Sequence, residues 1–177
     1  MTAAFQSTVY INMGFGVPGE RFTDAPYIAQ SYTIQSASAA YNIIGATACT
    51  ITSQGFCQAG SAGTLGFAGI LVDPKDVALF GAGGIPLNPT LTVPNFTQVE
   101  CLTMGMITVT LPAACAIGDY VIYDNTTGAL STITPSTLLP SGKTFANAIV
   151  AYFTPDASGS QLAVIQVNPT FIIPQPI

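Results

Sequence analysis

The chain lacks the side chain that proteins use most often for proton transfer and metal binding, because it contains no histidine. Without an imidazole, neither a serine–histidine–aspartate nor a cysteine–histidine nucleophile can be assembled. A pair of carboxylates could still hydrolyse a glycoside, and the chain has eight Asp and Glu residues. Most of these acids stand beside turn residues, and a role in fixing those turns is enough to explain their presence. We therefore expect a protein that is not an enzyme.

Two glycine-containing stretches resemble phosphate-binding loops but lack the structural setting of such loops. Residues 14–19 (GFGVPG) match the letters GxGxxG, a motif that works by opening a helix whose N-terminus receives the pyrophosphate. Pro18 and Pro26 disfavour that helix, so the stretch is predicted to be a loop. Residues 142–144 (GKT) end like a P-loop, but Thr137 stands where the earlier glycine should be. The sequence predicts no bound nucleotide.

The cysteines are the remaining residues that could bind a metal. No two of the four form a CxxC pair, and zinc sites combine such pairs with each other or with histidine. No metal and no cofactor are therefore expected. We predict reduced, buried thiols in a protein made in a reducing cytoplasm, with a Cys49–Cys57 disulfide as the main alternative. The four residues are Cys49, Cys57, Cys101 and Cys115.

Charge is scarce in this chain. Of 177 residues three are Lys or Arg and eight are Asp or Glu, and the formal net charge is −5; in typical soluble domains roughly a quarter of residues are charged. With no basic patch to neutralise phosphates, nucleic-acid binding is not expected. No apolar run reaches the roughly 18 residues of a membrane helix, and no signal peptide is expected. A surface so poor in charge is predicted to lie against other protein, in an obligate assembly.

The chain is organised around residues 98–133. Over residues 98–111 apolar and polar side chains alternate, as in a strand with one buried face. Gly105 interrupts this pattern and indicates a bulge or a close backbone approach. Residues 120–123 form the next apolar run, and turn residues at 124–128 lead into a return strand that ends at Ile133.

Further short strands are predicted on both sides of this centre, separated by glycine and proline. One of them, residues 65–72, is apolar throughout, which is typical of a strand covered on both faces. The one helix signal lies at residues 73–81 and spans two turns at most. These patterns predict an all-β fold: a small β-barrel, a β-tulip-like domain or a sandwich. The other predicted strands cover residues 27–34, 41–51, 148–153 and 162–167, and residues 54–63 are predicted to be a loop.

The chain divides into one domain and two extended ends. Residues 1–13 are predicted to be an uncharged N-terminal arm, residues 14–167 a single all-β domain, and residues 168–177 a Pro-rich tail. The tail is apolar but cannot pair as a central strand, so we expect it to lie in a groove of its own chain or of a neighbour. Near the start of the domain, Glu20, Arg21 and Asp24 form the densest charge cluster, which either pins its own loop or meets a partner.

Several short motifs follow one another along residues 14–168: GVPGE at 16–20, FAGILVDPKD at 67–76, LTVPNFTQVECLTMG at 91–105 and AIGDYVIYD at 116–124, then the closing strands AIVAYFT and LAVIQVN. Together they resemble the structural cement, or capsid decoration, proteins of tailed phages. The resemblance implies a small β-barrel or β-tulip-like domain on the outside of the major capsid shell. It implies attachment at junctions between capsomers, resistance to the pressure of packaged DNA, and a trimer or a dimer. It implies no catalytic residues.

The alternative interpretation is a virion β-sandwich that binds carbohydrate or a receptor, although the chain has no Trp to serve as a sugar platform. A cement protein should occur at stoichiometric copy number, whereas a receptor-binding module should be present in few copies. We expect the chain to be made in the host cytoplasm and to contact the major capsid protein and itself. The candidate contact residues are Val9, Tyr10, Ile11, Glu20, Arg21, Asp24, Phe171, Ile172 and Ile173.

Overall fold

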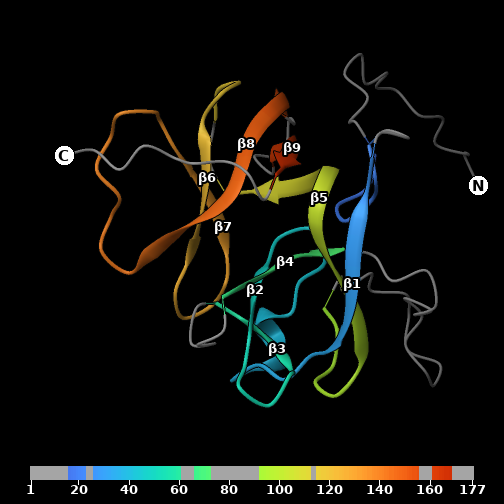
Figure 1. Ribbon diagram of the computed structural model, residues 1–177. Helices are drawn as coiled ribbons and strands as arrows, with labels where there is room; N and C mark the ends of the chain where they lie inside the picture. The colour runs from blue at the N-terminus through green and yellow to red at the C-terminus, as the bar shows by residue number, and fades with distance from the viewer. Residues whose placement is uncertain are drawn as a thin grey trace, which may run out of the picture.

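The computed structural model describes residues 16–22, 26–60, 66–72, 92–112, 115–155 and 161–168. They form one continuous antiparallel sheet of nine strands, which curls into a half-barrel (Figure 1). The strand order is β3-β2-β4-β5-β9-β8-β6-β7, and β1 pairs with β5 beside this path. The elements are β1 (Ile28–Thr33), the 3₁₀ turn η1 (Ala39–Tyr41), β2 (Ala48–Ile51), β3 (Cys57–Ala59), β4 (Phe67–Val72), β5 (Gln98–Leu111), β6 (Tyr120–Asp124), β7 (Leu130–Ile133), β8 (Lys143–Pro155) and β9 (Gln161–Val167).

Strand β5 organises the sheet because it is long enough to pair with three other strands. Its first half, through Met104, pairs with β1 and β4, and its second half, from Gly105, pairs with β9. Gly105 has φ +134°, and a Cβ there would lie 3.2 Å from the carbonyl oxygen of Pro26, so the predicted close backbone approach is confirmed. In Figure 1, β5 runs between an upper group of strands, β6 to β9, and a lower group, β2 to β4.

The curled sheet buries two hydrophobic clusters, one on each face of β4. Ile70 and Val72 belong to the larger cluster, which is filled mainly by β5, β6, β8 and β9. Ala68 and Leu71 belong to the smaller one, with side chains of β2, β3 and the first half of β5. The strand predicted at 65–72 is therefore covered on both faces, as its unbroken apolar sequence indicated.

Two local predictions were wrong. The strand expected over 41–51 begins only at Ala48, because the preceding residues are held by side-chain hydrogen bonds instead of a strand ladder. Within them, the buried Asn42 Nδ2 donates to the carbonyl oxygen of Val93 at 3.0 Å and to Asn95 Oδ1 at 2.9 Å. Residues 57–59, expected in a loop, form β3 and pair with β2.

The all-β prediction is confirmed, and the 3₁₀ turn η1 is the one helical segment among the residues described above. In that part of the chain no helix is long and apolar enough to span a membrane. The helix expected at 73–81, the arm at 1–13 and the tail from residue 169 lie outside the described residues.

The turn between β6 and β7 is fixed by the carboxylate of Asp124. Asp124 Oδ1 accepts from the backbone N–H groups of Thr126 and Thr127, each at 2.9 Å, and Oδ2 accepts from Lys143 Nζ at 3.2 Å. The N–H groups of Thr127 and Thr126, and then the ammonium of Lys143, lower the pKa of Asp124 to about 2. The charged form therefore stabilises the fold.

We expect Asp124→Ala to lower the free energy of unfolding at pH 7 by about 1–2 kcal/mol, since it removes charge-assisted hydrogen bonds at a partly exposed site. The unfolded-state pKa of an Asp is about 3.9, so this contribution is complete above about pH 4 and is lost as the pH falls toward 2. Urea unfolding of the unaltered protein and of Asp124→Ala at several pH values measures this contribution to stability. A difference between the two proteins that stays constant down to pH 2 would contradict this account of the turn.

Candidate docking surface

Residues 16–22 lie along the second half of β5 as a short added edge. Gly19 N donates to the carbonyl oxygen of Thr108 at 2.8 Å, and Thr108 N donates to that of Glu20 at 3.0 Å. Phe22 N donates to the carbonyl oxygen of Met106 at 3.1 Å. The glycine- and proline-containing stretch is thus attached to the central strand of the fold and opens no helix.

Glu20 and Arg21 are the two described members of the predicted charge cluster. Their side chains make different contacts within the chain. The exposed Glu20 turns back on its own segment, where Oε2 accepts from Val17 N at 3.2 Å. The exposed Arg21 places its guanidinium 4.9 Å from the centroid of the Tyr27 ring, within the range of a cation–π contact. Asp24 lies outside the described residues. Glu20 and Arg21 thus hold their own loop in place, and contact of Glu20, Arg21 and Asp24 with a partner stays a prediction.

The turn around Gly45 lies directly against residues 16–22. A Cβ on Gly45 would lie 2.3 Å from Gly19 N and 2.6 Å from the carbonyl carbon of Pro18, and Gly45 has φ +67°. Its carbonyl oxygen accepts from Thr110 N at 2.9 Å, and its N–H donates to the carbonyl oxygen of Leu71 at 2.8 Å. This one glycine therefore joins the added edge to β4 and β5, and no other residue type fits there without strain.

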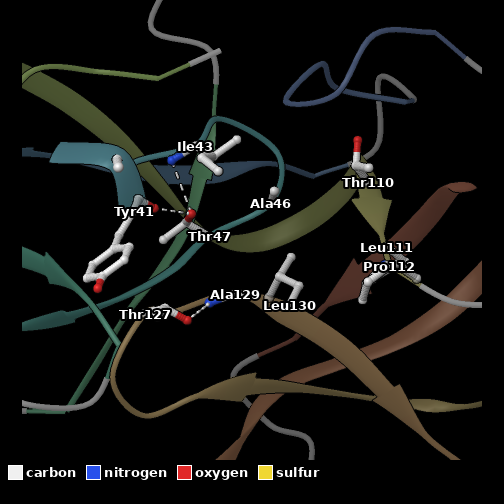
Figure 2. A pocket seen from close by; sticks show the side chains of 11 residues that line it. Tyr41, Ile43, Ala46, Thr47, Thr110, Leu111, Pro112, Thr127, Ala129 and Leu130 are labelled. Carbon is white, nitrogen blue, oxygen red and sulfur yellow. Dashed lines mark hydrogen bonds between the residues drawn. The ribbon is translucent and has the colours of Figure 1, made fainter. Parts of the chain in front are cut away.

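A pocket of about 250 Å³ opens beside this turn, between residues 40–47, the end of β5 and the turn that connects β6 to β7 (Figure 2). One of its hydroxyl groups is engaged within the walls: Thr47 Oγ1 donates to the carbonyl oxygen of Tyr41 at 2.6 Å and accepts from Ile43 N at 3.1 Å. Among the described residues that line the pocket, none carries a charged side chain. They are Ala40, Tyr41, Ile43, Ala46, Thr47, Thr110, Leu111, Pro112, Thr127, Ala129 and Leu130.

We call residues 16–22, the turn at 43–47 and this pocket the docking surface. It exposes two aliphatic side chains, since Val17 is 57% and Ile43 is 37% accessible to solvent. An apolar segment of another chain could cover both and fill the pocket, whereas a charged ligand would find no counter-ion in the pocket walls. The sequence analysis missed the pocket, because its walls come from segments far apart in the chain.

A second feature that the sequence analysis missed lies in the smaller hydrophobic cluster. Cys49, Cys57 and Cys101 are fully buried, and their three Sγ atoms all lie within 4.8 Å of one another. These thiols and that of Cys115 are free. No local spacing could have revealed the cluster, since its members lie on β2, β3 and β5 and meet only through the curl of the sheet.

The fold has a counterpart among solved structures. A chain from "The capsid of Myoviridae Phage XM1" superposes with a TM-score of 0.58 at 18% sequence identity, over 95% of this chain and 99% of that one. In sequence, residues 5–168 match the family described as Structural cement protein (E217 gp24/Pam3 gp6). This chain belongs to the phage cement family. No curated protein matches it in sequence.

Membership of the cement family confirms the resemblance inferred from the short motifs, and it assigns the chain a structural, non-enzymatic role in the virion. The match spans every described residue, including the docking surface. Six of the nine candidate contact residues, those of the N-terminal arm and the tail, lie outside the described residues, as Asp24 does. These six are Val9, Tyr10, Ile11, Phe171, Ile172 and Ile173.

Proposed function

We propose that this cement-family chain binds the outer surface of the major capsid shell at junctions between capsomers and holds them together against the pressure of packaged DNA. The observation that carries the proposal is the family match over residues 5–168. The likeness in fold to a chain of a phage capsid structure supports it.

The chemistry of the docking surface suits attachment to protein. Val17 and Ile43 are aliphatic and accessible, and the neighbouring pocket is apolar and uncharged. Burial of such groups stabilises a contact by roughly 25 cal/mol per Å² of apolar surface removed from water. Each contact can be modest, because many copies closing around a shell act together.

The two ends of the chain are proposed to reach beyond the domain. Residues 1–13 and 168–177 contain apolar groups that are costly to leave in water, and the prolines of the tail do not suit a central strand. We propose that they contact the major capsid protein or a second copy of this chain, in a homotrimer or a homodimer. Strand addition is one route for the N-terminal arm.

Replacing the apolar residues of each end by serine tests this proposal without changing the length of the chain. We expect the variant with serine at Val9, Tyr10 and Ile11, and the variant with serine at Phe171, Ile172 and Ile173, each to weaken the affinity for capsids at least tenfold, which corresponds to about 1.4 kcal/mol. Occupancy is measured by pelleting undecorated capsids with each protein and quantifying the bound chain.

The matched control for these variants is Leu138→Ser, which removes an exposed apolar side chain of the β7–β8 loop. This loop belongs neither to the docking surface nor to the two ends (Figure 1), so we expect the control to bind like the unaltered protein. Unchanged occupancy by both end variants would refute the role of the ends, and equal losses in all three proteins would show that the contact is unspecific.

A further inference from the structure

The three buried sulfur atoms come from strands that are not all neighbours. Cys57 lies on β3, Cys49 on the adjacent β2, and Cys101 on β5, with β4 standing between β2 and β5 in the sheet. All three side chains are 0% accessible, yet the sulfur atoms converge to within 4.8 Å of one another. The curl of the sheet thus brings three thiols to a single point in an apolar surrounding.

Disulfide bonding does not account for this convergence. A disulfide needs Cα atoms about 4.4–6.8 Å apart. Cys49 faces Ala59 and Cys57 faces Ile51 in the β2–β3 ladder, so the two cysteines are diagonal neighbours, which are about 7–8 Å apart. Cys101 is two strand spacings, about 9.5 Å, from β2. At these ideal spacings neither Cys49 and Cys57 nor Cys49 and Cys101 are placed for a disulfide, and all three thiols are free in the structure.

The arrangement matches the geometry of three thiolates around one ion. For metal–sulfur bonds of about 2.3 Å, trigonal coordination puts the sulfur atoms about 4.0 Å apart, which small side-chain movements reach from the observed spread. Zinc prefers a fourth ligand, and the cluster offers no fourth Cys, His, Asp or Glu among the described residues. We propose that Cys49, Cys57 and Cys101 form a buried three-coordinate site for one soft, thiophilic metal ion of the cuprous type.

Metal binding at this site is coupled to the loss of protons from the thiols. Each sulfur that binds as a thiolate releases its own proton, and the single positive charge of a cuprous ion offsets the charge of one thiolate. Because the site is sealed, the metal must enter as the chain folds.

Gly69 is a positioning residue for this site. It faces Cys49 across the β2–β4 ladder, and a Cβ on Gly69 would lie 2.5 Å from the carbonyl oxygen of Leu102 and 3.0 Å from the carbonyl carbon of Cys101. The missing side chain therefore lets β5 approach β4 closely at the cysteine. The metal would join β2, β3 and β5, and β3 lies at the end of the strand order and is only three residues long.

The test is to produce the full chain in copper-supplemented cells and to purify it without oxygen in the presence of a cuprous chelator. We expect one copper per chain by elemental analysis, and an X-ray absorption spectrum with three sulfur ligands at about 2.3 Å. The copper-loaded protein should also melt about 5 °C or more above the metal-free protein.

Cys101→Ala should lose copper at least tenfold, whereas Cys115→Ser, which changes the half-buried cysteine outside the cluster, should keep one copper per chain. The proposal is overturned if the unaltered chain carries no copper, if Cys101→Ala retains it, or if zinc binds instead with a fourth, light ligand. Should Cys101→Ala fail to fold, the sulfur count in the spectrum of the unaltered protein decides. None of the three readouts involves the capsid, so this test is independent of the proposed function.

Discussion

Gly45→Ala is expected to lower the free energy of unfolding by about 3 kcal/mol, because it combines backbone strain with a clash that side-chain motion cannot relieve. Gly45 has φ +67°, and the added Cβ would meet backbone atoms of Gly19 and Pro18 at 2.3 and 2.6 Å. Movement of residues 16–22 away from β5 would relieve this clash at the lowest cost in free energy. We therefore expect faster hydrogen exchange at the Gly19 and Phe22 amides, which donate to β5.

The matched control is Gly55→Ala. Gly55 has a similar φ of +83°, but a Cβ there would have nothing within 4 Å. This substitution therefore carries the backbone strain alone, about 1 kcal/mol. Urea unfolding of both variants separates the free-energy cost of the clash from that of the backbone strain. Equal losses of stability, with unchanged exchange at Gly19, would show that residues 16–22 do not rest on the turn at Gly45.

The second large effect is expected on capsid binding. Val17→Asp combined with Ile43→Asp should lower capsid occupancy at least tenfold and leave the melting temperature nearly unchanged. In the free protein both side chains are accessible to solvent, so the new carboxylates stay hydrated. In a protein contact each carboxylate would lose water without gaining a partner, which costs several kcal/mol per buried charge.

Leu138→Asp is the control for this variant, because Leu138 is 72% accessible and lies on the β7–β8 loop. Pelleting with undecorated capsids, alongside a thermal melt of each protein, gives both quantities. Normal occupancy for the Val17 and Ile43 double variant would show that the docking surface faces solvent on the particle. A fall in occupancy that is matched by a lower melting temperature would attribute the effect to folding instead.

The parts of the fold that the sequence predicted are those set by local periodicity. Alternation over 98–111 identified β5, the turn residues at 124–128 identified the β6–β7 connection, and the unbroken apolar run at 65–72 identified a strand buried on both faces. In each case neighbouring residues alone decide which side chains are buried, so a single stretch carries the information.

The missed features depend on residues far apart in the chain. The strand expected from Tyr41 begins only at Ala48, because Asn42 finds its hydrogen-bond partners at Val93 and Asn95. The pocket and the cluster formed by Cys49, Cys57 and Cys101 likewise arise where the curl of the sheet brings separate strands together. Hydrophobic pattern and turn chemistry describe each strand by itself and do not give the curvature of the sheet.

Copy number and position on the particle test the central proposal most directly. We predict that a cryo-EM reconstruction of the decorated capsid contains one domain of this size at every equivalent junction between capsomers on the outer surface, in fixed ratio to the major capsid protein. Capsids without the chain should break at lower temperature than decorated ones. A chain present in a few copies at the tail or fibres, or capsids of equal heat tolerance with and without it, would contradict the proposal.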